Sequence, residues 1–256
     1  MQLQALIFDV DGTIAETADL HREAWNHAFA IHGIGWHWTR AIFSRLLPLP
    51  DGIARLRAFG MGVDPSQFAS LLAGGGLRRL IAAKTAAYAR ALRAGAAMPR
   101  PGIIRLIAEA RSADVPIAAV STGSRIEFDL LLFHAVGFDA LGWFDCVRTR
   151  DDCPGQPDAA GPYSATIRAM ALNPHQCLAI DDSDEGATAA ATAGLRVLAT
   201  PGIYTSSHRF HGANLVLSDL GRPDAPFDVI RGNAHGHQFA SLTALQDWAE
   251  ASVQAA

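Results

Sequence analysis

One stretch near the start of the chain decides the fold, Leu3-Gln-Ala-Leu-Ile-Phe-Asp-Val-Asp-Gly-Thr13. Its apolar part, Ala5–Phe8, is typical of a short buried strand. The apolar run then breaks into two carboxylates one residue apart, Asp9 and Asp11. Carboxylates at the end of a buried strand repel each other and are costly to remove from water. The pattern therefore predicts either a bound cation or a plain acidic turn.

The residues that follow favour the cation. Gly12 permits a sharp turn of the backbone, and Thr13 places a hydroxyl beside the carboxylates. Ligands that are all oxygen suit a hard ion such as Mg²⁺. We therefore expect a magnesium site that includes Asp9 and Asp11.

The composition excludes several classes of protein. The chain has 256 residues, is 50% hydrophobic and carries a formal net charge of -4, so it can form a large core and has no basic surface for nucleic acid. It shows no signal peptide and no apolar run of membrane-spanning length. Its three cysteines cannot all pair within one chain and lack zinc-site spacing. We expect a soluble cytoplasmic protein that binds neither nucleic acid nor membranes.

The spacing of apolar residues divides the chain into parts. Residues 16–97 are predicted to be helical without a strand, since apolar residues such as Leu20, Ala24 and Ile31 recur at helical spacing. Residues 1–15 and 98–218 are predicted to form an α/β core. Residues 219–256 form a C-terminal extension, in which Ser241 begins a last amphipathic helix.

A second apolar run, Val115–Val120, leads into Ser121-Thr122-Gly123-Ser124. Ser124 and Glu127 match a capping box that opens the next helix. A strand followed by a turn and a helix start is a natural anion site, because free N–H groups point out of the helix. The alternative is an ordinary helix cap.

A third run, Cys177–Ile180, ends in the adjacent carboxylates Asp181 and Asp182. Further short strands are predicted at Phe144–Val147 and Leu195–Ala199. Strands that alternate with helices indicate a doubly wound parallel sheet. Such sheets bind ligands beyond the carboxyl ends of their strands, so one cleft can collect all three polar turns.

The order of these turns resembles the haloacid dehalogenase superfamily of phosphohydrolases. That resemblance implies a Rossmann-like core with an inserted helical cap, in which Asp9 is the nucleophile and Asp11 the acid/base. It further implies that Ser121 holds the phosphoryl group, and Thr122 adds a hydroxyl beside it. In the fourth motif of the superfamily, which completes the Mg²⁺ site, Asp182 is our first choice as ligand and Asp181 our second.

Within the superfamily, the segment from Glu16 to Asn26 is similar to the β-phosphoglucomutase-like branch. His21 matches a histidine that positions the acid/base there, although a partly buried helix residue is an equal alternative. Gly35-Trp-His-Trp38 and the segments at Tyr204-Thr205 and 215–223 look closer still to the Calvin-cycle-associated xylulose 1,5-bisphosphate phosphatases. The cap loop of that subgroup is matched only at Gly52 and Arg55.

One departure from the superfamily concerns charge. Its third motif supplies a lysine, but here Gly155-Gln-Pro-Asp-Ala-Ala-Gly-Pro-Tyr163 has Gln156 at that position. Lys84 is the only lysine in the chain, and it lies far from this motif. Arg148 or Arg150 could supply the charge, but an arginine fork does not replace a point charge directly.

We expect a Mg²⁺-dependent phosphatase that acts on a small phosphorylated metabolite, such as a sugar phosphate, through a phospho-aspartyl intermediate. The absent lysine predicts a slow enzyme. Two alternatives stay open: a pseudo-phosphatase that binds without turnover, and a phosphomutase.

Overall fold

A single sheet forms the centre of the structure, a computed structural model that describes residues 3–152 and 160–254. Its strands lie in the order β3-β2-β1-β4-β5-β6-β7, and all neighbours are parallel except β6 and β7. The strands are β1 (Ala5–Asp9), β2 (Ile117–Val120), β3 (Cys146–Arg148), β4 (Cys177–Asp181), β5 (Arg196–Ala199), β6 (Leu215–Leu217) and β7 (Val229–Arg231). The doubly wound parallel sheet that the sequence predicts is confirmed.

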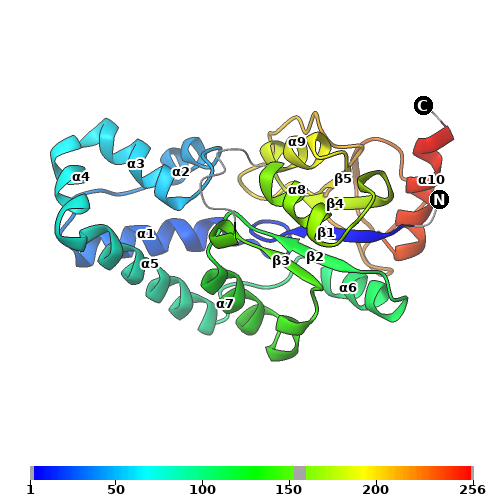
Figure 1. Ribbon diagram of the computed structural model, residues 1–256, viewed down its shortest axis with the longest axis horizontal. Helices are drawn as coiled ribbons and strands as arrows, with labels where there is room; N and C mark the ends of the chain where they lie inside the picture. Colours follow the sequence, from blue (N-terminus) through cyan, green and yellow to red (C-terminus); the bar gives the residue numbers. More distant parts are fainter. Residues whose placement is uncertain (1–2, 153–159, 255–256) are drawn as a thin grey trace.

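Helices cover both faces of this sheet (Figure 1). Because side chains alternate along a strand, Leu6 and Phe8 of β1 pack into one core cluster while Ala5 and Ile7 pack into another. The first cluster includes residues of α6 (Ile103–Ser112), α7 (Arg125–Ala135) and α10 (Leu242–Gln254). The second includes residues of α8 (Ala160–Ala169) and α9 (Asp184–Thr192).

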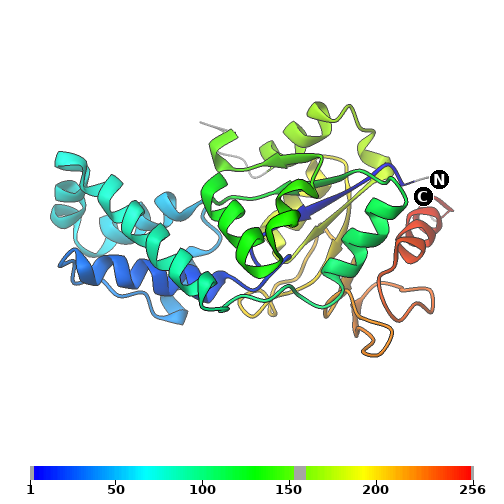
Figure 2. The same ribbon diagram turned by 90° about the horizontal axis from the view of Figure 1, so that it is seen from below.

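A separate helical body follows β1, and we call residues 18–93 the helical insert. It consists of α1 (Ala18–Ile31), α2 (Arg40–Leu46), α3 (Gly52–Val63), α4 (Pro65–Leu72) and α5 (Gly76–Arg93). Residues 18–93 contain no strand, and they lie within the segment 16–97 that the sequence predicts to be helical. The insert has its own core, which includes Trp25, Phe29, Trp38 and Phe43. It stands beside the sheet rather than on either of its faces (Figures 1 and 2).

The two connections between insert and sheet run side by side. Ala15 on the outgoing connection pairs with Pro99 on the returning one. The guanidinium of Arg100, which is nearly buried, donates hydrogen bonds to the carbonyl oxygens of Gly12 and Thr200, each at 2.6 Å. Arg100 therefore ties the turn after β1 to the turn after β5.

The C-terminal segment completes the sheet and one of its faces. Strand β7 pairs with β6, and Leu245 and Trp248 of α10 join the same cluster as Phe227. The N–H of Ala244 donates to Ser241 Oγ at 3.1 Å, so the predicted cap of this helix is present. None of the helices in the described ranges is both long and apolar enough to cross a membrane.

Candidate active site

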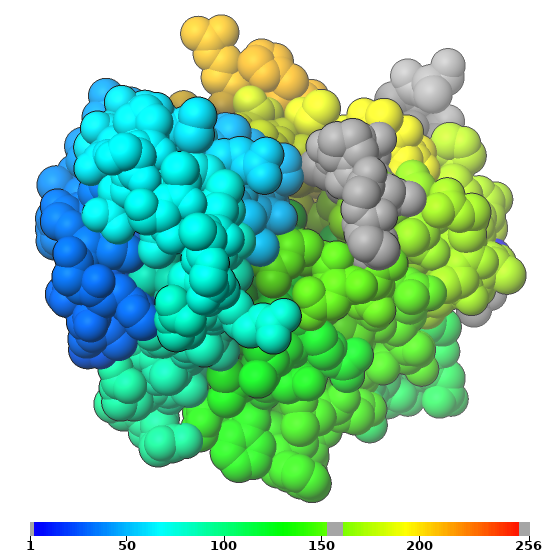
Figure 3. Space-filling model, turned by 60° about the vertical axis from the view of Figure 1, so that its left-hand side comes forward, coloured from blue at the N-terminus to red at the C-terminus, as the bar shows by residue number. Residues whose placement is uncertain are grey.

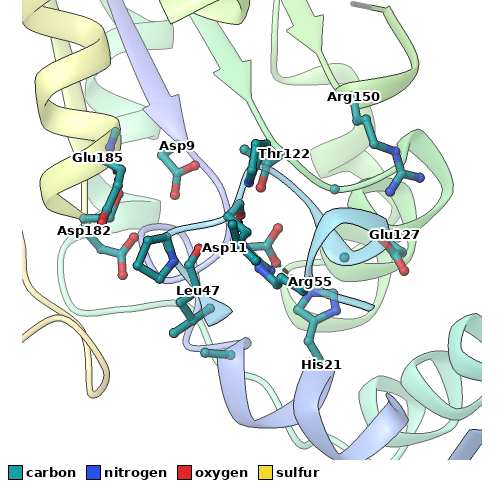
Figure 4. A pocket seen from close by; sticks show the side chains of 18 of the residues that line it. Asp9, Asp11, His21, Leu47, Arg55, Thr122, Glu127, Arg150, Asp182 and Glu185 are labelled. Atoms are coloured by element: carbon teal, nitrogen blue, oxygen red, sulfur yellow. Dashed lines mark hydrogen bonds and ion pairs between the residues drawn. The ribbon is translucent and has the colours of Figure 1, made fainter. Parts of the chain in front are cut away.

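The carboxyl ends of three adjacent strands bring the predicted residues together. Asp9, the last residue of β1, lies beside Val120 of β2, and Phe8 lies beside Ile180 of β4. The turns that follow these strands therefore meet at one edge of the sheet. Figure 4 shows Asp9 and Asp182 at one end of the resulting pocket, with Asp11 and Thr122 in its middle.

Asp9, Asp181 and Asp182 form a cluster of carboxylates. Each offers an oxygen, and these oxygens all lie within 4.8 Å of one another. Burial raises the pKa of Asp9 well above its usual value, and the charges of Asp181 and Asp182 add to the effect. Burial and the charge of Asp181 likewise raise the pKa of Asp182 well above the usual value. A cluster of like charges with oxygen ligands, buried at Asp181 and half-buried at Asp9 and Asp182, fits Mg²⁺.

Asp9 supports this fit independently. Its Oδ2 atom is buried and has no hydrogen-bond partner among the described residues. A buried carboxylate oxygen without a partner is costly, and a hard cation would satisfy it. Gly12 makes room for the cluster, because a Cβ atom at this position would lie only 2.2 Å from Asp182 Oδ2.

Asp181 and Asp182 differ in the hydrogen bonds that their carboxylates accept. Asp181 Oδ2 accepts a hydrogen bond of 2.5 Å from the Tyr163 hydroxyl, and Asp181 Oδ1 accepts two of 2.9 Å from the N–H and hydroxyl of Ser183. Asp182 accepts only a long bond of 3.4 Å from Thr205 Oγ1 among the described residues. Asp182 therefore has more capacity left for a metal ion, which favours the first choice from the sequence.

Asp11 has a different environment. Its Oδ1 accepts hydrogen bonds from Thr17 Oγ1 at 2.7 Å and from His21 Nε2 at 3.0 Å, and its Oδ2 accepts one from Ser121 Oγ at 3.3 Å. Burial alone would raise the pKa of Asp11, but His21, Thr17 and the charge of Lys84 outweigh it and hold that pKa well below the usual value. Its side chain accepts hydrogen bonds from all of these donors, so we expect its backbone carbonyl rather than its carboxylate to serve as a metal ligand.

The turn after β2 has the predicted form. The Ser124 side chain and the Glu127 carboxylate close a capping box at the start of α7. Ser121 Oγ accepts the N–H of Gly123 at 2.9 Å, and Thr122 lines the pocket. Thr13 is fully buried, and its hydroxyl has no partner within the described part of the chain.

The pocket between the helical insert and the sheet has a volume of about 310 Å³. Figure 3 shows the surface hollowed between the insert, in blue and cyan, and the rest of the molecule, in green and yellow. The insert contributes Arg55 and an apolar wall that includes Leu47, Leu49 and Ile53. Arg55 donates to the carbonyl oxygens of Leu47 and Leu49, while its buried Nε has no partner among the residues described.

Comparison with known proteins identifies the family to which the chain belongs. A family model for haloacid dehalogenase-like hydrolases matches residues 3–194. The chain belongs to this family. The hydrolase is similar to protein CbbY of Cupriavidus necator, with 38% identity over 247 residues that cover 96% of each chain. The family resemblance inferred from the sequence is thus confirmed.

Solved structures support the CbbY-like subgroup. Crystal structures of CbbY from Rhodobacter sphaeroides cover 85% of this hydrolase and 95% of that chain. One, in complex with phosphate, has a TM-score of 0.77 at 32% identity. The other, a mutant in complex with xylulose-(1,5)bisphosphate, has a TM-score of 0.75 at 31% identity.

Whether Arg148 or Arg150 replaces the missing lysine, or the enzyme is slow without it as we expect, stays a prediction. Gln156 lies outside the described residues of the hydrolase. Arg150 lines the pocket, but it lies beyond Thr122 from Asp9 (Figure 4). Arg148 is not among the described residues that line the pocket. Neither arginine is hydrogen-bonded or ion-paired to Asp9 within the described ranges.

Sequence reasoning missed several residues of the site. Thr17 donates a hydrogen bond to Asp11, and Tyr163 donates one to Asp181. No sequence spacing predicted either contact. Lys84 donates to His21 Nδ1 at 2.7 Å and forms an ion pair with Glu127. The sequence marks Lys84 only as the single lysine of the chain, and nothing in its local spacing indicates these contacts.

Proposed function

We propose that this hydrolase is a Mg²⁺-dependent phosphatase that acts on a phosphorylated sugar through a phospho-aspartyl intermediate. One observation carries the proposal: a single pocket holds two neighbouring carboxylates in opposite environments. Asp9 has a buried oxygen without a described partner, whereas Asp11 accepts three hydrogen bonds. A free carboxylate suits a nucleophile, and a positioned one suits an acid/base.

In the first step, an oxygen of Asp9 attacks phosphorus, and the bond from phosphorus to the ester oxygen breaks. Asp11 gives its proton to that leaving oxygen. The substrate-free site holds Asp11 ionised, but a bound phosphoryl group adds negative charge beside it and raises its pKa. His21 and Thr17 keep the carboxylate in place throughout.

In the second step, water attacks the phosphorus of the phospho-aspartyl group and frees Asp9. Asp11, ionised again, takes the proton of that water. This step matches the environment that the structure gives Asp11, because its three donors stabilise the ionised form.

Mg²⁺ would be held by Asp9, Asp182 and the backbone carbonyl of Asp11, with Asp181 as second choice, and it would offset the negative charge of the phosphoryl oxygens. The hydroxyls of Ser121 and Thr122 would orient those oxygens. Phosphoryl transfer depends mostly on such positioning and electrostatics.

The rest of the pocket favours a sugar phosphate. Arg55 from the insert and Arg150 from the sheet side line it together. These cations are separate from the carboxylate cluster, so they suit a second negative group on the substrate. A related CbbY binds xylulose-(1,5)bisphosphate, and we extend that class of substrate to this chain. The helical insert would act as a cap that excludes water.

A pseudo-phosphatase is the second candidate. One observation favours it: among the described residues, no lysine or arginine is hydrogen-bonded or ion-paired to Asp9. A site without such a cation would bind Mg²⁺ and phosphorylated ligands but turn them over slowly.

Phosphate release from a panel of sugar monophosphates and bisphosphates, including xylulose 1,5-bisphosphate, tests the proposal. We expect release that requires Mg²⁺ and is abolished in Asp9→Asn, with the circular dichroism of that variant unchanged. Mg²⁺ binding without release from any ester would instead support the pseudo-phosphatase. Normal release by Asp9→Asn would exclude Asp9 as nucleophile.

A further inference from the structure

The only lysine of the chain lies at the contact between the helical insert and the sheet. Lys84, on α5 of the insert, is only 4% exposed. Its ammonium forms an ion pair with Glu127, on α7 beside the sheet. It also lies 5.2 Å from the ring centre of Tyr88 and 5.8 Å from that of Trp25. A buried ammonium is costly unless it is paired, so Glu127 is what allows the charge to stay there.

Glu127 contacts two parts of the molecule at once. Its Oε1 pairs with Lys84, while its Oε2 accepts the backbone N–H of Ser124 at 3.2 Å. Ser124 ends the turn that begins with Ser121. One carboxylate therefore joins the helical insert to the turn that we assign to phosphoryl binding.

Lys84 also determines how His21 is oriented. An ammonium has no lone pair and can only donate, so His21 Nδ1 accepts its hydrogen bond and the ring proton lies on Nε2. That Nε2–H then donates to Asp11 Oδ1 at 3.0 Å. The Tyr88 ring, stacked on His21 at 4.3 Å, keeps the imidazole in this plane. The contacts form a continuous chain from Glu127 to Asp11.

We propose that Glu127 is a positioning residue that latches the helical insert to the sheet through Lys84 and so holds His21 against Asp11. The latch follows from the contacts alone, whereas its effect on turnover rests on the proposed function. A purely structural role, in which Glu127 only caps α7, is the competing explanation.

The latch can be tested without any activity, because Lys84 is the only side-chain amine. The protein is treated with an acetylating N-hydroxysuccinimide ester, and mass spectrometry follows the peptide that contains Lys84. We expect Glu127→Gln to be acetylated at least about tenfold faster than wild type, because breaking a buried pair leaves an uncompensated charge that favours opening and the reactive neutral amine. Equal rates would overturn the latch.

Asp129→Asn is the matched control for this experiment. Asp129 lies on the same helix and pairs with Arg125 at 2.9 Å, but both side chains are more than 40% exposed. Loss of an exposed pair has little effect, so Lys84 should be acetylated at the wild-type rate. If Asp129→Asn accelerated acetylation as much as Glu127→Gln, general loosening of α7 would explain the result and the latch would be overturned.

Kinetics tests the positioning role. We expect Glu127→Gln to lower kcat on a sugar phosphate about tenfold or more with KM nearly unchanged, and to have no further effect in a Lys84→Met background. With p-nitrophenyl phosphate the leaving group needs no proton. The initial burst of p-nitrophenol, which reports the attack of Asp9 on phosphorus, should therefore keep its wild-type rate. An equal loss in the Lys84→Met background, or an equally slowed burst, would overturn the positioning role.

The latch can still be tested if Glu127→Gln does not fold or if the protein turns over no phosphate ester. If Glu127→Gln does not fold by circular dichroism, Glu127→Asp keeps the charge on a shorter side chain and should give an acetylation rate above that of wild type. A wild-type rate in Glu127→Asp would then overturn the latch. If no phosphate ester is turned over at all, the proposed function fails while the acetylation result still decides the latch.

Discussion

Gly12 lies so close to the Asp182 side chain that a Cβ atom at position 12 would have to displace this carboxylate. Its φ is +98°, and a Cβ atom there would lie 2.2 Å from Asp182 Oδ2. We expect Gly12→Ala to cost about 1–3 kcal/mol in stability through backbone strain and to displace Asp182. The dissociation constant for Mg²⁺, measured by titration calorimetry, should rise at least about tenfold because one ligand is lost.

Gly33→Ala is the control for that variant. Gly33 also has a positive φ, +65°, but nothing lies within 4 Å of its Cβ position. Gly33→Ala should therefore lose stability through backbone strain without any change in the dissociation constant for Mg²⁺. If both variants weakened binding equally, displacement of Asp182 would not be the cause.

Asp182→Ala and Asp181→Ala should separate metal binding from folding. Removal of Asp182 relieves repulsion in the carboxylate cluster, so Asp182→Ala should weaken Mg²⁺ binding at least about tenfold without lowering the melting temperature of the metal-free protein. Removal of Asp181 leaves the Tyr163 hydroxyl buried without its partner. Asp181→Ala should therefore destabilise the fold by about 1–3 kcal/mol. The reverse pattern in thermal melts and calorimetry would make Asp181 the main ligand.

Mg²⁺ binding should weaken as the pH falls. Burial raises the folded-state pKa of Asp9 and Asp182 above the usual value of 3.8, so these groups keep protons in a pH range where the unfolded chain has lost them. Mg²⁺ must displace those protons. Calorimetry in buffers of different ionisation enthalpy should detect proton release, with tighter binding at about pH 7.5 than at about pH 5.5. Because these folded-state pKa values are raised, the metal-free fold should lose stability as the pH rises above the unfolded-state pKa. Affinity that does not depend on pH would contradict this cluster as the site.

Arg55→Ala should raise KM for a sugar bisphosphate about tenfold or more, because a hydrogen bond between charged groups is worth about 1.5–3 kcal/mol. The effect on a small monophosphate should be weaker. Arg57→Ala, on the same helix but exposed and outside the pocket lining, is the matched control. Equal effects of the two variants in steady-state assays would remove Arg55 from substrate binding.

Gln156→Lys tests the missing cation. Removing one preorganised charge partner typically lowers the rate by a factor of about 10²–10³. If the enzyme is slow, as we expect, Gln156→Lys should raise kcat by up to about that factor. If the rate did not change and Arg150→Ala abolished turnover instead, the arginine would have taken over the role.

The sequence by itself determined the sheet and the polar turns that end its strands. Apolar runs followed by Asp9, Ser121 and Asp181 were enough, because the carboxyl ends of parallel strands share one edge. The capping box at Ser124 was equally readable, since it depends on residues three apart. Strands β6 and β7, of three residues each, were not predicted.

Only the tertiary structure decided how the acid/base is held. Lys84 is 63 residues from His21 and 43 from Glu127, and no local pattern relates them. The same holds for Arg100, which contacts carbonyl oxygens of Gly12 and Thr200. It also holds for the difference between Asp181 and Asp182, which are identical and adjacent in sequence. Tyr163 and Ser183 donate hydrogen bonds to Asp181, whereas Asp182 accepts only the long one from Thr205 among the described residues. The difference arises because burial and hydrogen bonding depend on which elements pack together.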